Sequence, residues 1–110
     1  MWAGDAEAGA NRLGELVGDN PFDGFGLLML AEYWQAKGDA ERAIMLLERA
    51  SLVSPYAAEA HRRRGGILVG RGDYAAGLMA LRKAQDLEPG NLLAEYIRGV
   101  ERLERLFERE

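Results

Sequence analysis

The residues of this 110-residue chain that could do chemistry gather around its single histidine, His61, which Arg62, Arg63 and Arg64 follow directly. The chain has no cysteine, and no acid stands at metal-ligand spacing from the imidazole, so a structural role is favoured over catalysis. No nucleophile has a plausible base, and the glycines that follow Arg64 lack the preceding strand and the Gly-Lys-Ser/Thr sequence of a phosphate loop. We therefore predict a protein that is not an enzyme and has no cofactor and no bound metal.

The three consecutive arginines suggest a second kind of chemistry, the binding of anions. Consecutive residues point about 100° apart on a helix, so the triplet faces three directions, and Glu59 lies close by. A nucleic-acid-binding surface would need further basic residues and exposed aromatic rings on the same face. The net charge of −4 does not favour such a surface. Binding of an anionic ligand or nucleic acid through Arg62 to Arg64, with Arg71, is the alternative function, although we expect no nucleic acid.

A sequence repeat determines where these residues lie. Gly-Asp pairs and prolines recur every 34 residues, as Gly4-Asp5, Gly38-Asp39 and Gly72-Asp73, and as Pro21, Pro55 and Pro89. In each period the glycine suits a tight turn after one helix, the aspartate caps the next helix, and the proline follows its end. A fixed period of this length is typical of stacked helix pairs. We predict six helices, at approximately 5–18, 23–37, 40–53, 57–71, 74–87 and 91–108.

The repeat resembles the tetratricopeptide (TPR) repeat in both period and motif. The first full copy has Leu27, Leu30, Ala31, Trp34, Ala43, Leu47 and Pro55 at the motif positions, and the second has His61, Arg64, Gly65, Leu68, Gly77, Leu81 and Pro89. The resemblance implies an all-α fold, a right-handed α-solenoid of antiparallel helix pairs. The chain would be one domain, 1–110, with a half repeat at 1–23, repeats at 24–57 and 58–91, and a capping helix at 92–110. Small residues such as Ala43, Gly65 and Gly77 would be close-packing positions in its core.

The resemblance also implies a function, because the first helix of each TPR repeat lines a concave groove that binds peptides. Carried onto this chain, the groove comprises Phe25, Leu28, Glu32, Gln35, Glu59, Arg62, Gly66, Val69, Gly70, Leu93, Tyr96 and Val100. Gly66 and Gly70 would give it a floor without side chains. We expect a non-catalytic scaffold for protein–protein interaction, which binds a peptide segment of a partner and belongs to a larger protein or assembly.

The last predicted helix carries an apolar stripe from 93 to 107, and two interpretations of it stay open. The stripe packs onto the preceding repeat as a cap, or it remains exposed for a partner, since both roles require the same spacing. Leu103, Leu106 and Phe107 are candidates for an oligomer contact. A homodimer, or more generally a self-assembly module, is therefore a further alternative.

The overall composition is that of a globular protein, with 48% hydrophobic and 29% charged residues. No apolar run approaches the roughly 18 residues of a membrane span, and the residues after Met1 do not form a signal-peptide pattern. The absence of cysteine leaves the compartment open between cytoplasm and periplasm. Arginine supplies nearly all of the basic residues, which hints at a bacterial genome rich in GC.

Overall fold

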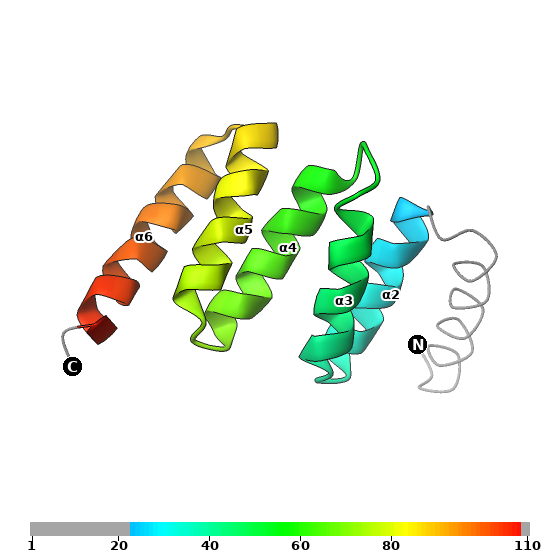
Figure 1. Ribbon diagram of the computed structural model, residues 1–110, viewed down its shortest axis with the longest axis horizontal. Coiled ribbons are helices and arrows are strands. Elements are labelled where there is room, and N and C mark those ends of the chain that lie inside the picture. Colours follow the sequence, from blue (N-terminus) through cyan, green and yellow to red (C-terminus); the bar gives the residue numbers. More distant parts are fainter. Residues whose placement is uncertain (1–22, 109–110) are drawn as a thin grey trace. The chain divides into compact units, whose positions relative to one another are not determined.

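The computed structural model describes residues 23–108, which form α-helices and no strand (Figure 1). The helices are α2 (Gly24–Ala36), α3 (Ala40–Ala50), α4 (Ala57–Gly70), α5 (Tyr74–Leu87) and α6 (Asn91–Glu108). The prediction of an all-α protein is thus confirmed for these residues. The bounds of α5 and α6 are the predicted ones, whereas the predicted helix at 5–18 lies outside the described residues.

The chain divides into two compact units, Met1–Tyr56 and Ala57–Glu110. Among the described residues, the first unit holds α2 packed on α3, and the second holds α4 packed on α5 and α5 packed on α6. The boundary between the units falls within one residue of the predicted boundary between the two full repeats. Within residues 23–108, each unit therefore contains a helix hairpin, and α6 is added to the hairpin of the second unit.

The turns inside the two hairpins have the same geometry. Gly38 and Gly72 adopt φ angles of +84° and +81°, a left-handed conformation that side-chain-bearing residues rarely adopt. The N–H of Gly38 donates to Gln35 O and that of Asp39 donates to Trp34 O, and the same two bonds recur 34 residues later. This pair of bonds is the Schellman motif, which satisfies carbonyl groups at the end of a helix. The glycine therefore ends α2 and α4 in the same way.

An aspartate begins the helix after each of these turns. Asp39 accepts a hydrogen bond from the N–H of Arg42 at 3.1 Å, and Asp73 accepts one from Ala76 at 3.3 Å. Asp23 caps α2 in the same way through the N–H of Gly26. Each cap satisfies one N–H group that would otherwise lack a partner in the first turn of the helix.

The core of the first unit is aliphatic. Leu27 and Ala31 of α2 are buried together with Ala43, Leu47 and Ala50 of α3. Four of them, Leu27, Ala31, Ala43 and Leu47, stand at the repeat-motif positions of the first full copy. The ring of Tyr56 packs over Gly24, where a Cβ atom would collide with it.

The predicted helix at 40–53 is wrong at its end, because α3 stops at Ala50. Beyond that residue the N–H groups of Leu52 and Val53 donate to carbonyls three residues back, at Arg49 and Ala50. The hydroxyl of Ser51 donates to Glu48 O at 2.6 Å. The last turn therefore tightens and leaves the α-helical pattern.

The second unit has a core that extends over three helices. Leu78 and Leu81 of α5 are buried against Ile97 and Val100 of α6, with Val69, Tyr74 and Leu93 packed around them. On its other side α5 crosses α4 at two buried glycines. A Cβ atom on Gly65 would lie 3.0 Å from the carbonyl oxygen of Gly77, so only glycine permits this approach of the two backbones.

Polar contacts complete the packing of α6 on α5. Arg82 Nη2 lies 3.0 Å from Glu101 Oε2, which joins the two helices along their exposed edge. The side chain of Gln85 donates to Gly90 O and accepts from the N–H of Gly90, at 3.2 Å each. The loop between the helices is thus tied to α5.

Candidate functional site

The predicted groove residues on α2 differ in their accessibility. Phe25 is 57% exposed, and Glu32 and Gln35 are exposed as well. Leu28, by contrast, is only 4% exposed and belongs to the core. Leu28 therefore has almost no surface to offer a partner, and of the two apolar groove residues on α2 only Phe25 is exposed.

On α6, two of the predicted groove residues pack inward. Val100 is 1% exposed and lies in the core against α5, and Leu93 packs beside it. Tyr96 remains exposed. The interpretation of the stripe as a cap on the preceding helices therefore fits Leu93 and Val100.

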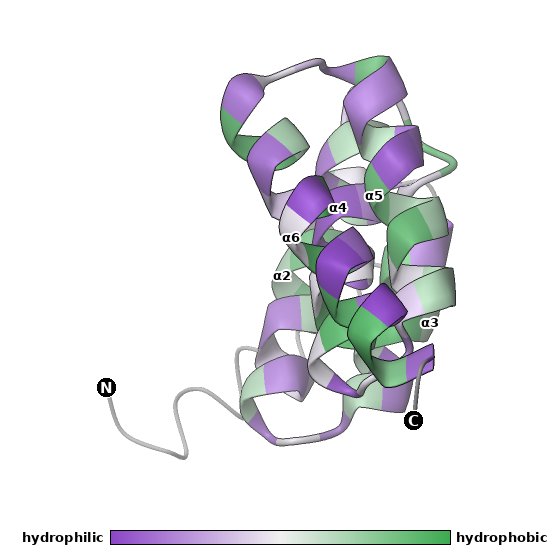
Figure 2. Cartoon of the chain, turned by 90° about the vertical axis from the view of Figure 1, so that its left-hand side faces the viewer, coloured by the Kyte–Doolittle hydropathy of each residue, from purple (hydrophilic) through white to green (hydrophobic). Residues whose placement is uncertain are grey.

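The candidate oligomer contact on α6 also divides into two parts. Phe107 stacks on Tyr74 of α5, with ring centroids 5.7 Å apart and ring planes 18° apart. Leu103 and Leu106 make no such contact and are exposed. Figure 2, in which α6 lies nearest the viewer, shows hydrophilic and hydrophobic residues interleaved along this helix.

The predicted glycine floor on α4 is open. Apart from its chain neighbours and its own helix backbone, a Cβ atom at Gly66 or at Gly70 would meet no atom within 4 Å, in contrast to one at Gly65. Val69 is different, because its Cγ2 atom lies against Gly77 of α5 and its side chain joins the core. The two open glycines are one helical turn apart and form, with Arg62 one turn earlier, a strip along α4 that we call the glycine strip.

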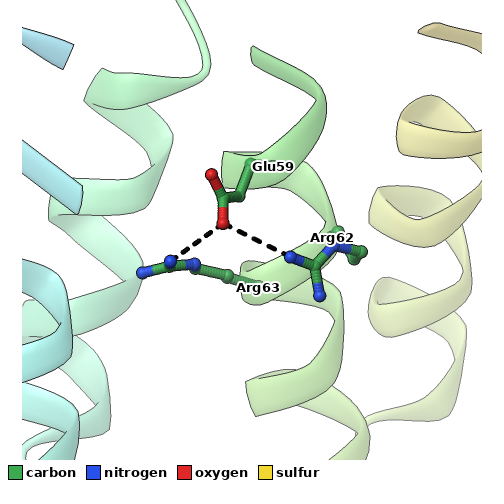
Figure 3. Close-up of polar contacts among 3 residues, drawn as sticks. All are labelled: Glu59, Arg62 and Arg63. Carbon is green, nitrogen blue, oxygen red and sulfur yellow. Dashed lines mark hydrogen bonds and ion pairs between the residues drawn. The ribbon is translucent and has the colours of Figure 1, made fainter. Parts of the chain in front are cut away.

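Glu59 holds two of the three arginines at the start of this strip (Figure 3). Its Oε1 atom lies 2.8 Å from Arg63 Nη2 and 3.4 Å from Arg62 Nη2. One carboxylate thus partly neutralises two guanidinium groups. Figure 3 shows Arg62 and Arg63 approaching this oxygen from opposite sides.

The histidine lies where α4 meets α5. Nδ1 of His61 is 3.4 Å from Nη2 of Arg64. Burial lowers the pKa of His61 below its ordinary value of 6.5, and the positive charges of Arg64 and Lys83 lower it further.

The sequence did not predict a shallow pocket between α2 and α3. It has a volume of about 270 Å³ and is lined by Leu30, Trp34, Arg42, Met45, Leu46 and Arg49. The guanidinium carbon of Arg42 lies 4.3 Å from the ring centroid of Trp34, a cation–π contact, and Arg42 Nε lies 3.3 Å from Asp39 Oδ2. The eight-residue spacing of Trp34 and Arg42 carries no helical signal, because a turn separates them.

Over residues 23–108, no three histidine or carboxylate side chains form a group that could hold a metal ion. No helix in this part of the chain is long and apolar enough to cross a membrane. No model of a known protein family matches the chain, and no curated protein matches it.

Proposed function

We propose that this chain is a non-catalytic protein-interaction module of the TPR type, a right-handed solenoid that holds a peptide segment of a partner against α4. The observation that carries the proposal is the glycine strip. Gly66 lies inside a helix, where glycine costs up to about 1 kcal/mol relative to alanine. Gly65 repays that cost by close packing, whereas Gly66 meets open space. A partner main chain that lies directly on the strip requires a residue without a side chain at position 66. Glycine at this position then permits a close approach, as Gly65 does for α5.

The chemistry of the strip suits a peptide more than a small ligand. Gly66 and Gly70 let a main chain approach α4 without displacing side chains. Arg62, whose side chain is 54% exposed, stands one turn before Gly66 and can donate to a carbonyl or carboxylate of that main chain. Glu59 beside it can accept from a peptide N–H.

Binding of nucleic acid or another anion through the arginines has weaker support, because Glu59 already engages Arg62 and Arg63. This alternative predicts an affinity that falls steeply with salt, since phosphate contacts release counterions. A fluorescence-anisotropy titration with single-stranded and duplex oligonucleotides at low salt tests it. We expect no saturable binding, and a steep salt dependence would favour the alternative.

The peptide-binding proposal can be tested with a peptide selected from a random display library on the full 110-residue chain. We expect Gly66→Leu to weaken binding of that peptide by at least about tenfold, because the side chain fills the strip. Ala75→Leu adds a leucine at an exposed position of α5 and should leave the affinity unchanged.

Circular dichroism of each variant shows whether folding is preserved. If the selected peptides bind folded Gly66→Leu as tightly as the original chain, the strip is not the binding site. If no peptide is selected at all, the proposal fails as a whole.

A further inference from the structure

The last helix presents a second apolar stripe, whose large side chains all remain substantially exposed. Leu92, Tyr96, Gly99, Leu103 and Leu106 are spaced by four, three, four and three residues, the spacing of a helix–helix seam. Their large side chains are 84%, 44%, 39% and 59% exposed, in the order of the chain. We call this stripe the α6 seam. It is separate from the stripe of Leu93, Ile97 and Val100 that packs on α5.

Gly99 stands at the centre of the seam and allows another helix to approach closely. It lies 34 residues after Gly65, the position at which α5 crosses α4. A Cβ atom on Gly65 would lie 2.7 Å from Leu81 Cγ, whereas one on Gly99 would meet nothing within 4 Å. The same position of the repeat thus holds a glycine in both helices. In α4 this glycine lies against α5, and in α6 nothing in the described part of the chain packs on it.

The two flanks of the seam differ in character. On a helical wheel Tyr96 and Leu103 lie on one side of Gly99, toward the stripe that packs on α5. Glu95 and Arg102 lie on the opposite side and are exposed. Neither of these charged side chains forms an ion pair among the described residues, unlike Glu101, which binds Arg82.

We propose that a second copy of this chain docks on the α6 seam, with the two α6 helices antiparallel about a two-fold axis at Gly99. A two-fold axis perpendicular to two antiparallel helices brings the apolar flank of one copy against the apolar flank of the other, and likewise the two charged flanks. Along the axis of the pair, the residues of the second helix then run in the opposite direction. Tyr96 of one copy then lies by Leu103 of the other, and the charged flanks meet with Glu95 beside Arg102. The seam is complementary to itself in both apolar contact and charge.

Self-complementarity is what identifies a second copy as the occupant. Glu95 lies four residues before Gly99 and Arg102 three residues after it, so reversal places opposite charges together at two symmetric points. A parallel pair would instead place the charged flank of one helix against the apolar flank of the other. Arg98 points about 100° away from Gly99 and lies outside the contact.

This contact differs from the one that the sequence predicts. Leu103 and Leu106 belong to it, but Phe107 is engaged by Tyr74 of its own unit. Leu92, Tyr96 and Gly99 take its place. The contact is therefore centred two turns closer to the start of α6.

Sedimentation of the full chain over about a hundredfold concentration range tests the dimer. We expect a reversible monomer–dimer equilibrium that Gly99→Leu weakens at least about tenfold, because the added side chain separates the helices. Arg98→Gln changes a charge outside the contact and should leave the equilibrium constant within about twofold.

Charge exchange tests the antiparallel pairing itself. Glu95→Arg and Arg102→Glu each place like charges at both symmetric points, so each variant alone should dimerise about tenfold more weakly. The double variant restores opposite charges and should recover the original affinity. The two single variants should also pair with each other better than with themselves, a result that a general loss of stability would not produce.

A monomer at every concentration overturns the proposal, and so does a mass that rises steadily toward a polymer. A dimer that is insensitive to both Gly99→Leu and the charge exchanges also overturns it, because that dimer would use another surface.

Discussion

The α2–α3 hairpin and the α4–α5 hairpin share a turn and a second helix but differ in the first helix. Both turns use a left-handed glycine and a capping aspartate, with φ angles within a few degrees of each other. Corresponding small and leucine positions of the second helices are buried in both, as Ala43, Leu47 and Ala50 and as Gly77, Leu81 and Ala84. The two copies of the 34-residue repeat are therefore most alike from the turn to the end of the second helix.

The first helices reach their cores by different means. Leu27, Leu30 and Ala31 of α2 are all buried. At the corresponding positions α4 has His61, Arg64 and Gly65, of which only the glycine is fully buried. The second unit compensates by bringing α4 close to α5 at glycines and by adding core residues from α6.

A repeat can thus keep its hairpin while its first helix acquires new surfaces. Fewer large apolar residues on α4 leave room for glycines that packing does not require, and these form the glycine strip. In the first unit, α2 has no such strip. Its Trp34 instead lines a pocket together with Arg42 of α3. The two hairpins thus present different surfaces on one scaffold.

The largest expected effect comes from shortening the leucine that both hairpins bury. Leu47→Ala and Leu81→Ala should each lower the free energy of unfolding by about 2–5 kcal/mol, because both side chains are fully buried and leave a cavity. Urea unfolding followed by circular dichroism measures both. A cost below about 1 kcal/mol at either site would show that this hairpin core relaxes around the cavity and that the two cores are not equivalent.

A smaller effect separates two neighbouring glycines of α4. Gly65→Ala should destabilise the chain by about 1 kcal/mol, because its Cβ atom meets Leu81 and the Gly77 carbonyl, which outweighs the gain in helix propensity. Gly66→Ala should stabilise it by about 0.5–1 kcal/mol, because the new methyl group enters open space. Thermal unfolding of the two variants in parallel gives the sign of each change. Destabilisation by both would mean that α4 is constrained at Gly66 as well.

Much of this fold could be predicted from sequence because its signals are local. A glycine–aspartate pair specifies both a left-handed turn and a helix cap within two residues, and α3 and α5 begin where these signals predict them. The end of α3 was missed because tight hydrogen bonds after Ala50 compete with a continuing helix, and helical periodicity does not detect them.

The surfaces were harder to predict, because burial depends on which neighbour covers a helical face. Val100 and Leu103 have the same spacing signal, but α5 covers the first and leaves the second exposed. Gly65 and Gly66 are adjacent and identical in type, and only the position of α5 distinguishes their environments. The pocket at Trp34 required the packing of two helices across a turn.

The smallest expected effect is a pH dependence that His61 gives to the second hairpin. Burial, Arg64 and Lys83 lower the pKa of His61, whereas the corresponding residue of the first hairpin is Leu27. The unfolded chain therefore binds more protons than the folded one between the lowered pKa and 6.5. The contribution of neutral His61 to the free energy of unfolding should be fully present above pH 6.5. It should be lost as the pH falls from 6.5 through the lowered pKa.

His61→Gln keeps an acceptor near Arg64 but cannot titrate, so it should remove this part of the pH dependence. Urea unfolding of both proteins between about pH 8 and pH 5 measures the difference, in which the acidic groups common to both largely cancel. We expect the original chain to lose more stability than His61→Gln over this range. Equal losses, or a gain in the original chain, would show that His61 protonates at least as readily in the hairpin as in the unfolded chain.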